Sequence, residues 1–185
     1  MRIFGGVLAG IALLALAMPA QAGITYTSYT VLNNQTVTVN FSNGTTETGV
    51  AGLITLHGVV QDGTGVGDLS VWCVDLFDNL ASSGSFTTQT PYAFDNAIYG
   101  KVDALISNGT PLLGNYNASA ALQIAIWTEL FGSIATISAP SDVEALAATY
   151  VTDVTNGTWA ADPHTALIEL TGTGNQSQAF LSNVP

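Results

Sequence analysis

The chain has 185 residues, a formal net charge of −11 and two basic side chains, Arg2 and Lys101. This acidity excludes the basic surface needed for nucleic acid or an anionic membrane. A hydrophobic fraction of 48% is enough for a core, which excludes a disordered acidic tail. Cys73 is the one cysteine, so an intrachain disulfide and a cysteine-based zinc cluster are excluded too.

Residues 1–22 predict a secretory signal peptide. Arg2 precedes an apolar run that ends at Pro19, and Ala20-Gln21-Ala22 has the small-x-small pattern of a cleavage site. We therefore expect an exported protein whose mature chain is a single domain, residues 23–185. Because no later segment is apolar and long enough, we expect no membrane span in the mature chain.

The first half of the mature chain has the two-residue alternation that is typical of strands. Thr, Val and aromatic residues, which favour half-buried pleated surfaces, are frequent there. The expected strands cover residues 24–27, 29–31, 37–41, 49–60 and 69–76. Turn signals separate them at Asn33-Asn34, at Asn43-Gly44 and in the glycine-rich loop 61–68.

The middle of the chain changes to helical spacing. We expect a helix at about 96–106, a second one capped by Asn117 or Ser119 and ended by Gly132, and a third from Ser141 to about Thr155. The third begins with the capping-box pattern Ser141-x-x-Glu144. Strands return at 165–170 and 178–181. This order predicts an α+β, mainly β fold: an antiparallel β-sandwich or barrel with about three inserted helices, at about 93–157.

Several potential sites lack the residues that their chemistry needs. The two histidines, His57 and His164, are too few for a metal site, and His57 has no acidic or Ser motif beside it in the sequence. We therefore expect no metal and no cofactor. Asp75 and Asp78 leave a secreted hydrolase open as a minor alternative, because a glycosidase needs two positioned carboxylates.

Cys73 is the first residue whose chemistry stays open. An unpaired cysteine in an exported chain is an intermolecular partner, a reactive thiol or an inert buried thiol. Gln123 is the second, because on a helical wheel it lies in an apolar stripe near Ile126 and Trp127. A carboxamide there is either a core amide bonded to the backbone or a group consumed by chemistry. A thiolate that attacks a carboxamide releases ammonia and leaves a thioester cross-link.

Two short motifs carry a family resemblance. Trp72-Cys73-Val74-Asp75 on an expected strand, with Leu122-Gln123-x-Ala125-Ile126-Trp127 on an expected helix, resembles the thioester domains of bacterial surface adhesins. The same motifs, with Leu112-Leu113-Gly114-Asn115-Tyr116 between them, look like those of exported Gram-negative proteins with PEP-CTERM sorting tails. The ending Asn183-Val184-Pro185 is where such a tail would begin. The resemblance covers roughly residues 69–132.

The resemblance implies roles for particular residues. Cys73 would supply the thioester sulfur and Gln123 the acyl carbon. The residues that would support the site are Trp72, Asp75, Ile126 and Trp127, with Asp75 orienting or polarising it. We then expect covalent attachment in a single turnover, not catalysis, to surface-protein amines or polysaccharide hydroxyls. The alternative is a noncovalent structural or carbohydrate-binding β module whose Cys73 stays free and buried.

Composition gives one further expectation. Amines attack thioesters, and after removal of the leader the amines of the chain are Lys101 and the amino group of Gly23. Such a scarcity of lysine suits a chain that carries an electrophile.

Overall fold

The computed structural model describes residues 23–89, 96–114 and 116–183, so the expected signal peptide (1–22) and Pro185 lie outside the described residues. The strands that build the sheet are β1 (Gly23–Tyr26), β2 (Ser28–Phe41), β3 (Thr46–Gln61), β4 (Thr64–Cys73), β5 (Gly84–Gln89), β6 (Ile134–Ser138), β7 (Thr165–Gly172) and β8 (Asn175–Asn183). The helices are α1 (Asn96–Gly109), the single 3-10 turn η1 (Thr110–Leu112), α2 (Tyr116–Leu130) and α3 (Ser141–Thr155).

Six of the strands close into a barrel. Their order is β1-β5-β7-β8-β4-β3, and β3 pairs back onto β1 to complete the ring. β2 and β6 extend the same sheet beyond β3. All strand pairs in the described part of the chain are antiparallel. The predicted mainly β, α+β fold is confirmed, in its barrel form.

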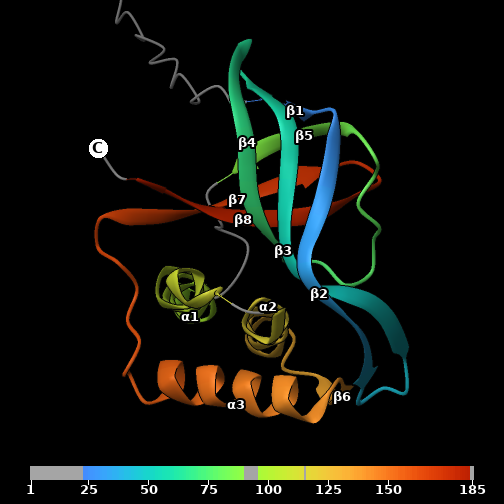
Figure 1. Ribbon diagram of the computed structural model, residues 1–185, viewed down its shortest axis with the longest axis vertical. Helices are drawn as coiled ribbons and strands as arrows, with labels where there is room; N and C mark the ends of the chain where they lie inside the picture. Colours follow the sequence, from blue (N-terminus) through green and yellow to red (C-terminus); the bar gives the residue numbers. More distant parts are fainter. Residues whose placement is uncertain (1–22, 90–95, 115, 184–185) are drawn as a thin grey trace, which may run out of the picture.

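The three helices cover one end of the barrel. In Figure 1, α1 and α2 are seen nearly end-on, between the strands and α3. α2 contacts α1 and α3 as well as β2 and β3, so it lies at the centre of the molecule. The predicted insertion of about three helices is confirmed, and it also contains β6, which pairs with β2.

α2 is buried on all sides, as its composition requires. Residues 118–127 are all buried. Small and apolar residues occur on every side of this helix, and α1, α3, β2 and β3 pack against it. Ser119, Gln123 and Trp127 recur at four-residue spacing and so lie on one face of α2. The Ser119 hydroxyl accepts from Leu53 N–H at 2.7 Å and donates to the Leu32 carbonyl at 3.3 Å. This face therefore fixes α2 to β2 and β3.

The N-terminal strands are longer than the sequence predicted. The expected turn at Asn33-Asn34 is wrong, because β2 runs through it with a register shift between Leu32 and Gln35, and Asn33 takes a positive φ of 50°. The expected loop 61–68 is wrong as well. The chain reverses tightly at Asp62 and Gly63, and β4 begins at residue 64. Glycines within β4 allow the register shifts there without a steric penalty.

α1 and α3 begin at the predicted residues, 96 and 141, but the helix caps differ from the sequence prediction. α2 begins at residue 116, so neither Asn117 nor Ser119 is its N-cap. Pro140 occupies the N-cap position of α3, and no side chain caps that end. Ser141 is therefore not the cap; the Glu144 carboxylate accepts instead from the Ala139 N–H at 2.8 Å. The strands β5 and β6 were not predicted.

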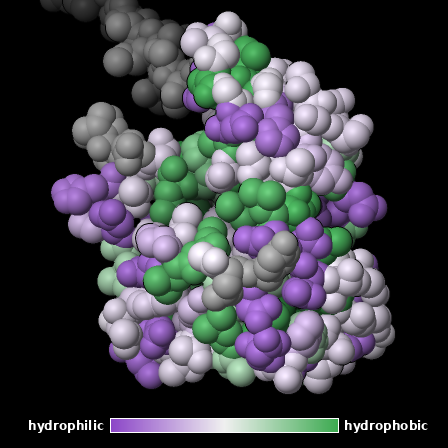
Figure 2. All heavy atoms as spheres, in the orientation of Figure 1, coloured by the Kyte–Doolittle hydropathy of each residue, from purple (hydrophilic) through white to green (hydrophobic). Residues whose placement is uncertain are grey.

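The surface carries hydrophobic residues in separate patches. On the face shown in Figure 2 they alternate with hydrophilic ones. Among the described large hydrophobic side chains, Phe77 is the most exposed, at 58%. Its ring is tilted against that of Phe41 and edge-on to that of Phe131, with ring centroids 5.4 and 5.8 Å away. None of the helices in the described residues has both the length and the hydrophobicity to cross a membrane.

Candidate functional site

Cys73 is the last residue of β4, at the end of the barrel that the helices cover. Cys73 is only 2% exposed. On one side it pairs with Gln178 of β8. On the other side, the β3–β4 ladder ends at the pair Ile54–Val71, two residues before Cys73. The main-chain N–H and C=O of Cys73 point to this second side, at the place where β3 leaves the ladder.

The carboxamide of Gln123 takes the place of a strand partner for Cys73. Gln123 is fully buried, and its Oε1 accepts from the Cys73 main-chain N–H at 3.0 Å. Its Nε2 donates to the Cys73 carbonyl oxygen at 2.8 Å. The oxygen and the nitrogen of the carboxamide thus both bind Cys73, in the way that opposite residues bind each other in an antiparallel strand pair. The two residues lie 50 positions apart in the sequence and are brought into direct contact.

The thiol of Cys73 lies in a nonpolar environment with two polar neighbours. It donates to the main-chain oxygen of Asp75 at 2.7 Å. The indole of Trp127 faces the sulfur and favours its ionised form. However, no acceptor among the described residues lies within normal hydrogen-bond distance and angle of the Trp127 Nε1–H. The thiol therefore donates one hydrogen bond, to Asp75, and the nearby Trp127 N–H makes no complete hydrogen bond.

Burial controls the ionisation of this thiol. Burial raises the pKa of Cys73 from 9.0 to about 12. Contacts with the main chain of Asp75 and with the Trp127 side chain offset part of that rise, while the negative charge of Asp75 adds to it. Cys73 is consequently a neutral thiol throughout the physiological pH range.

The remaining predicted site residues occupy different positions around this centre. The Asp75 carboxylate accepts from the Phe77 N–H at 2.8 Å, so Asp75 reaches the thiol through its main chain and not through its side chain. Ile126 is buried on α2 beside Gln123. Trp72 is buried too, but strand alternation puts it on the opposite face of β4 from Cys73, toward Ile106 of α1. Trp72 therefore packs the core beside the site without entering it.

Sequence reasoning missed two polar residues of this region. Gln178 is fully buried, directly opposite Cys73, and its Oε1 lacks a partner among the described residues. Ser119 fixes the first part of α2 to the sheet. The signal for Ser119 was present, because it lies one turn before Gln123 on the same helix face. Gln178 could be found only from the strand register.

The residues that the sequence set aside have structural partners. His57 has no acidic neighbour in the sequence, but the fold gives it one: its Nδ1 is 3.0 Å from Asp68 Oδ1, and its Nε2 is 3.0 Å from the Thr30 hydroxyl. These three side chains bridge adjacent strands on the barrel surface. In the part of the chain that the structure describes, no group of three or more His, Cys, Asp or Glu gathers as metal ligands would.

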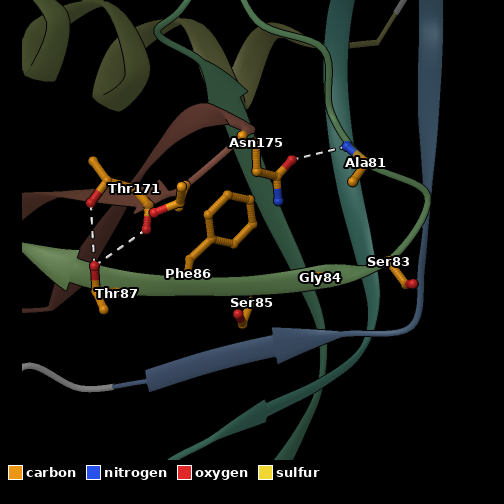
Figure 3. Close-up of a pocket in the computed structure, with 11 residues that line it drawn as sticks. Ala81, Ser83, Gly84, Ser85, Phe86, Thr87, Thr171 and Asn175 are labelled. Carbon is orange, nitrogen blue, oxygen red and sulfur yellow. Dashed lines mark hydrogen bonds between the residues drawn. The ribbon is translucent and has the colours of Figure 1, made fainter.

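A pocket of about 460 Å³ lies away from this centre, between the start of β5 and the turn that joins β7 to β8. Figure 3 shows the hydrogen bonds that Thr87 and Asn175 make within its lining. Thr87 reaches Thr171 at 3.3 Å, and Asn175 accepts from the Ala81 N–H at 2.9 Å. Its lining residues are all uncharged and, apart from Phe86, small or polar, so the pocket offers hydrogen bonds to a ligand but no charged or acid–base side chain.

Comparison with known proteins does not assign the chain to a family: no family model, no curated protein and no solved structure matches it. The site must therefore be interpreted from its own geometry.

Proposed function

We propose that this protein forms an internal thioester between Cys73 and Gln123 and uses it once, to attach covalently to a target outside the cell. The observation that carries the proposal is the pair of hydrogen bonds between the Gln123 carboxamide and the main chain of Cys73. They hold the carbon that would be attacked next to the residue that carries the nucleophile.

The direction of attack supports the same chemistry. A carboxamide that pairs with a strand residue lies near the plane of the sheet, whereas the side chain of that residue rises out of this plane. The Cys73 side chain therefore leaves the plane in which the amide group pairs, so its sulfur would approach Cδ from a face of the amide, as attack on a carbonyl carbon requires. The Cys73 N–H also polarises that carbonyl, as an oxyanion-hole donor does.

Formation of the bond can be balanced with these atoms alone. Sγ of Cys73 attacks Cδ of Gln123, the Cδ–Nε2 bond breaks, and the thiol proton leaves with the nitrogen as ammonia. Because the thiol is neutral, its proton must move as the sulfur attacks. The Trp127 N–H favours negative charge on the sulfur and would assist this step. Burial of both residues would then protect the thioester from water.

The amines of the chain are held by carboxylates. Lys101 Nζ lies 2.8 Å from Glu129 Oε2, and the Glu129 side chain is only 9% exposed. The Gly23 nitrogen, which would be the amino terminus after leader removal, lies 3.0 Å from Asp62 Oδ1. An ammonium group in an ion pair has no free electron pair for attack. This arrangement favours reaction with a target amine or hydroxyl over reaction of the protein with itself.

A noncovalent β module is the second candidate, and one observation favours it. Both hydrogen-bonding groups of the Gln123 carboxamide are satisfied, which is also what a purely structural core amide requires. In that case Gln123 would only replace a missing strand partner, and Cys73 would remain an inert thiol.

Methylamine separates the two candidates. We expect it to add once to residue 123 of the purified exported protein and to release one thiol, both detected by mass spectrometry after digestion. Cys73→Ala retains the main-chain hydrogen bonds and should take up no methylamine. If the wild-type protein and this variant behave alike, the thioester proposal is wrong and the noncovalent module is retained.

A further inference from the structure

Gln178 is a second buried carboxamide next to Cys73, and nothing in the chemistry above uses it. It is the cross-strand partner of Cys73. Side chains of directly opposed strand residues point to the same face, with Cβ atoms about 5 Å apart. Gln178 is fully buried at this position, although its carboxamide carries one donor group and one acceptor.

The orientation of this carboxamide is fixed by its donor side. Nε2 donates to the Gln176 main-chain oxygen at 3.2 Å and to Gln176 Oε1 at 3.1 Å. Both partners are acceptors, so the nitrogen must face them and the oxygen must face away. Oε1 of Gln178 has no donor among the described residues, which is costly for a fully buried carbonyl.

Two unsatisfied groups of opposite character therefore belong to residues next to Cys73: Trp127 acts on its thiol and Gln178 is its cross-strand partner. Trp127 offers an N–H and Gln178 offers a carbonyl oxygen, and both residues are at most 2% exposed. Such groups are rare in native structures, and each of them requires an explanation. The Trp127 donor faces the sulfur, while the Gln178 acceptor is suited to a molecule that brings its own N–H.

We infer that Gln178 orients the incoming nucleophile at the Cys73–Gln123 acyl centre and selects primary amines over hydroxyls. This inference rests on the thioester proposed above. In the reaction the amine nitrogen bonds to Cδ of residue 123, the Cδ–Sγ bond breaks, and one amine proton passes to Cys73. A primary amine keeps a second N–H that donates to Gln178 Oε1 throughout. A hydroxyl has a single proton, which must leave for the sulfur, so it loses this contact.

The test compares two nucleophiles on the intact exported protein. Methylamine carries N–H groups, whereas the thiolate of 2-mercaptoethanol exchanges with the thioester without donating a proton. In Gln178→Met we expect the second-order rate constant for methylamine to fall about tenfold, the effect of one lost hydrogen bond. The rate constant for the thiolate should stay within about twofold. Gln176→Met, on the same strand, should leave both rates near those of the wild type because the Gln176 main-chain oxygen still orients Gln178.

The outcomes separate the inference from the proposed function. A wild-type protein that reacts with neither nucleophile contradicts the thioester itself. A wild-type protein that reacts, with a Gln178→Met variant that slows both reactions equally or neither, contradicts the inference alone. The inference is also contradicted if Gln178→Met prevents the thioester from forming, since Gln178 would then act before the target arrives.

Discussion

Replacing Gln123 by methionine should abolish methylamine uptake and reduce the free energy of unfolding by about 2–4 kcal/mol. Methionine is unbranched and of similar size, so packing within α2 is retained. However, the Cys73 N–H and C=O both lose their partner in a fully buried position. An unsatisfied buried amide group costs about 1–3 kcal/mol, and here there are two.

The stability effect must be measured without any cross-link. Cys73→Ala leaves the main chain of residue 73 in place and removes the sulfur, so it is the reference protein. Urea unfolding of Cys73→Ala is compared with that of the double variant Cys73→Ala/Gln123→Met. A difference below about 1 kcal/mol would show that the carboxamide is not held by the main chain of residue 73.

Alkylation of Cys73 should be at least about 100-fold slower in the native protein than in the urea-unfolded protein at pH 8. The pKa of about 12 leaves the native thiol almost fully protonated, whereas an ordinary thiol with a pKa of 9.0 is partly ionised. Because the native pKa is raised, the thiolate fraction grows about tenfold per pH unit and continues to grow above pH 9. The measurement is iodoacetamide labelling of protein whose Cys73 is free, between pH 7 and 10.

The shape of the pH profile decides the second prediction. Cys73 is the single cysteine in the sequence, so the label reports on this thiol alone. The labelling rate of unfolded protein should bend near pH 9 and approach a plateau by about pH 10, while that of native protein should still rise about tenfold per pH unit there. A native profile that bends near pH 9 would mean that the thiol reacts only after the site opens.

The sequence predicted the class of fold because its patterns are local. Two-residue alternation located most strands, and helical spacing located all three helices. β5 and β6 were missed since both are short and owe their existence to pairing with β1, β7 and β2. The predicted capping box at Ser141 is wrong because Pro140 takes the N-cap position and the Glu144 carboxylate binds the N–H of Ala139, one residue before Pro140.

The candidate site was predictable in part for the same reason. Gln123 stood out because a carboxamide interrupts an apolar helix stripe, and Cys73 because it is the one thiol. Their contact depends on where the β3–β4 ladder ends, which alternation does not reveal. Gln178 depends on strand register, and a shift of one residue would turn it to the other face.

The mass of the intact protein without residues 1–22 tests the thioester most directly. We predict a mass one ammonia lower than that calculated for residues 23–185, with no alkylation of Cys73 until methylamine is added. Cys73→Ala should have its full calculated mass. A wild-type protein of full calculated mass, purified rapidly at neutral pH and with a freely titratable Cys73 thiol after unfolding, would contradict the proposed bond between Cys73 and Gln123.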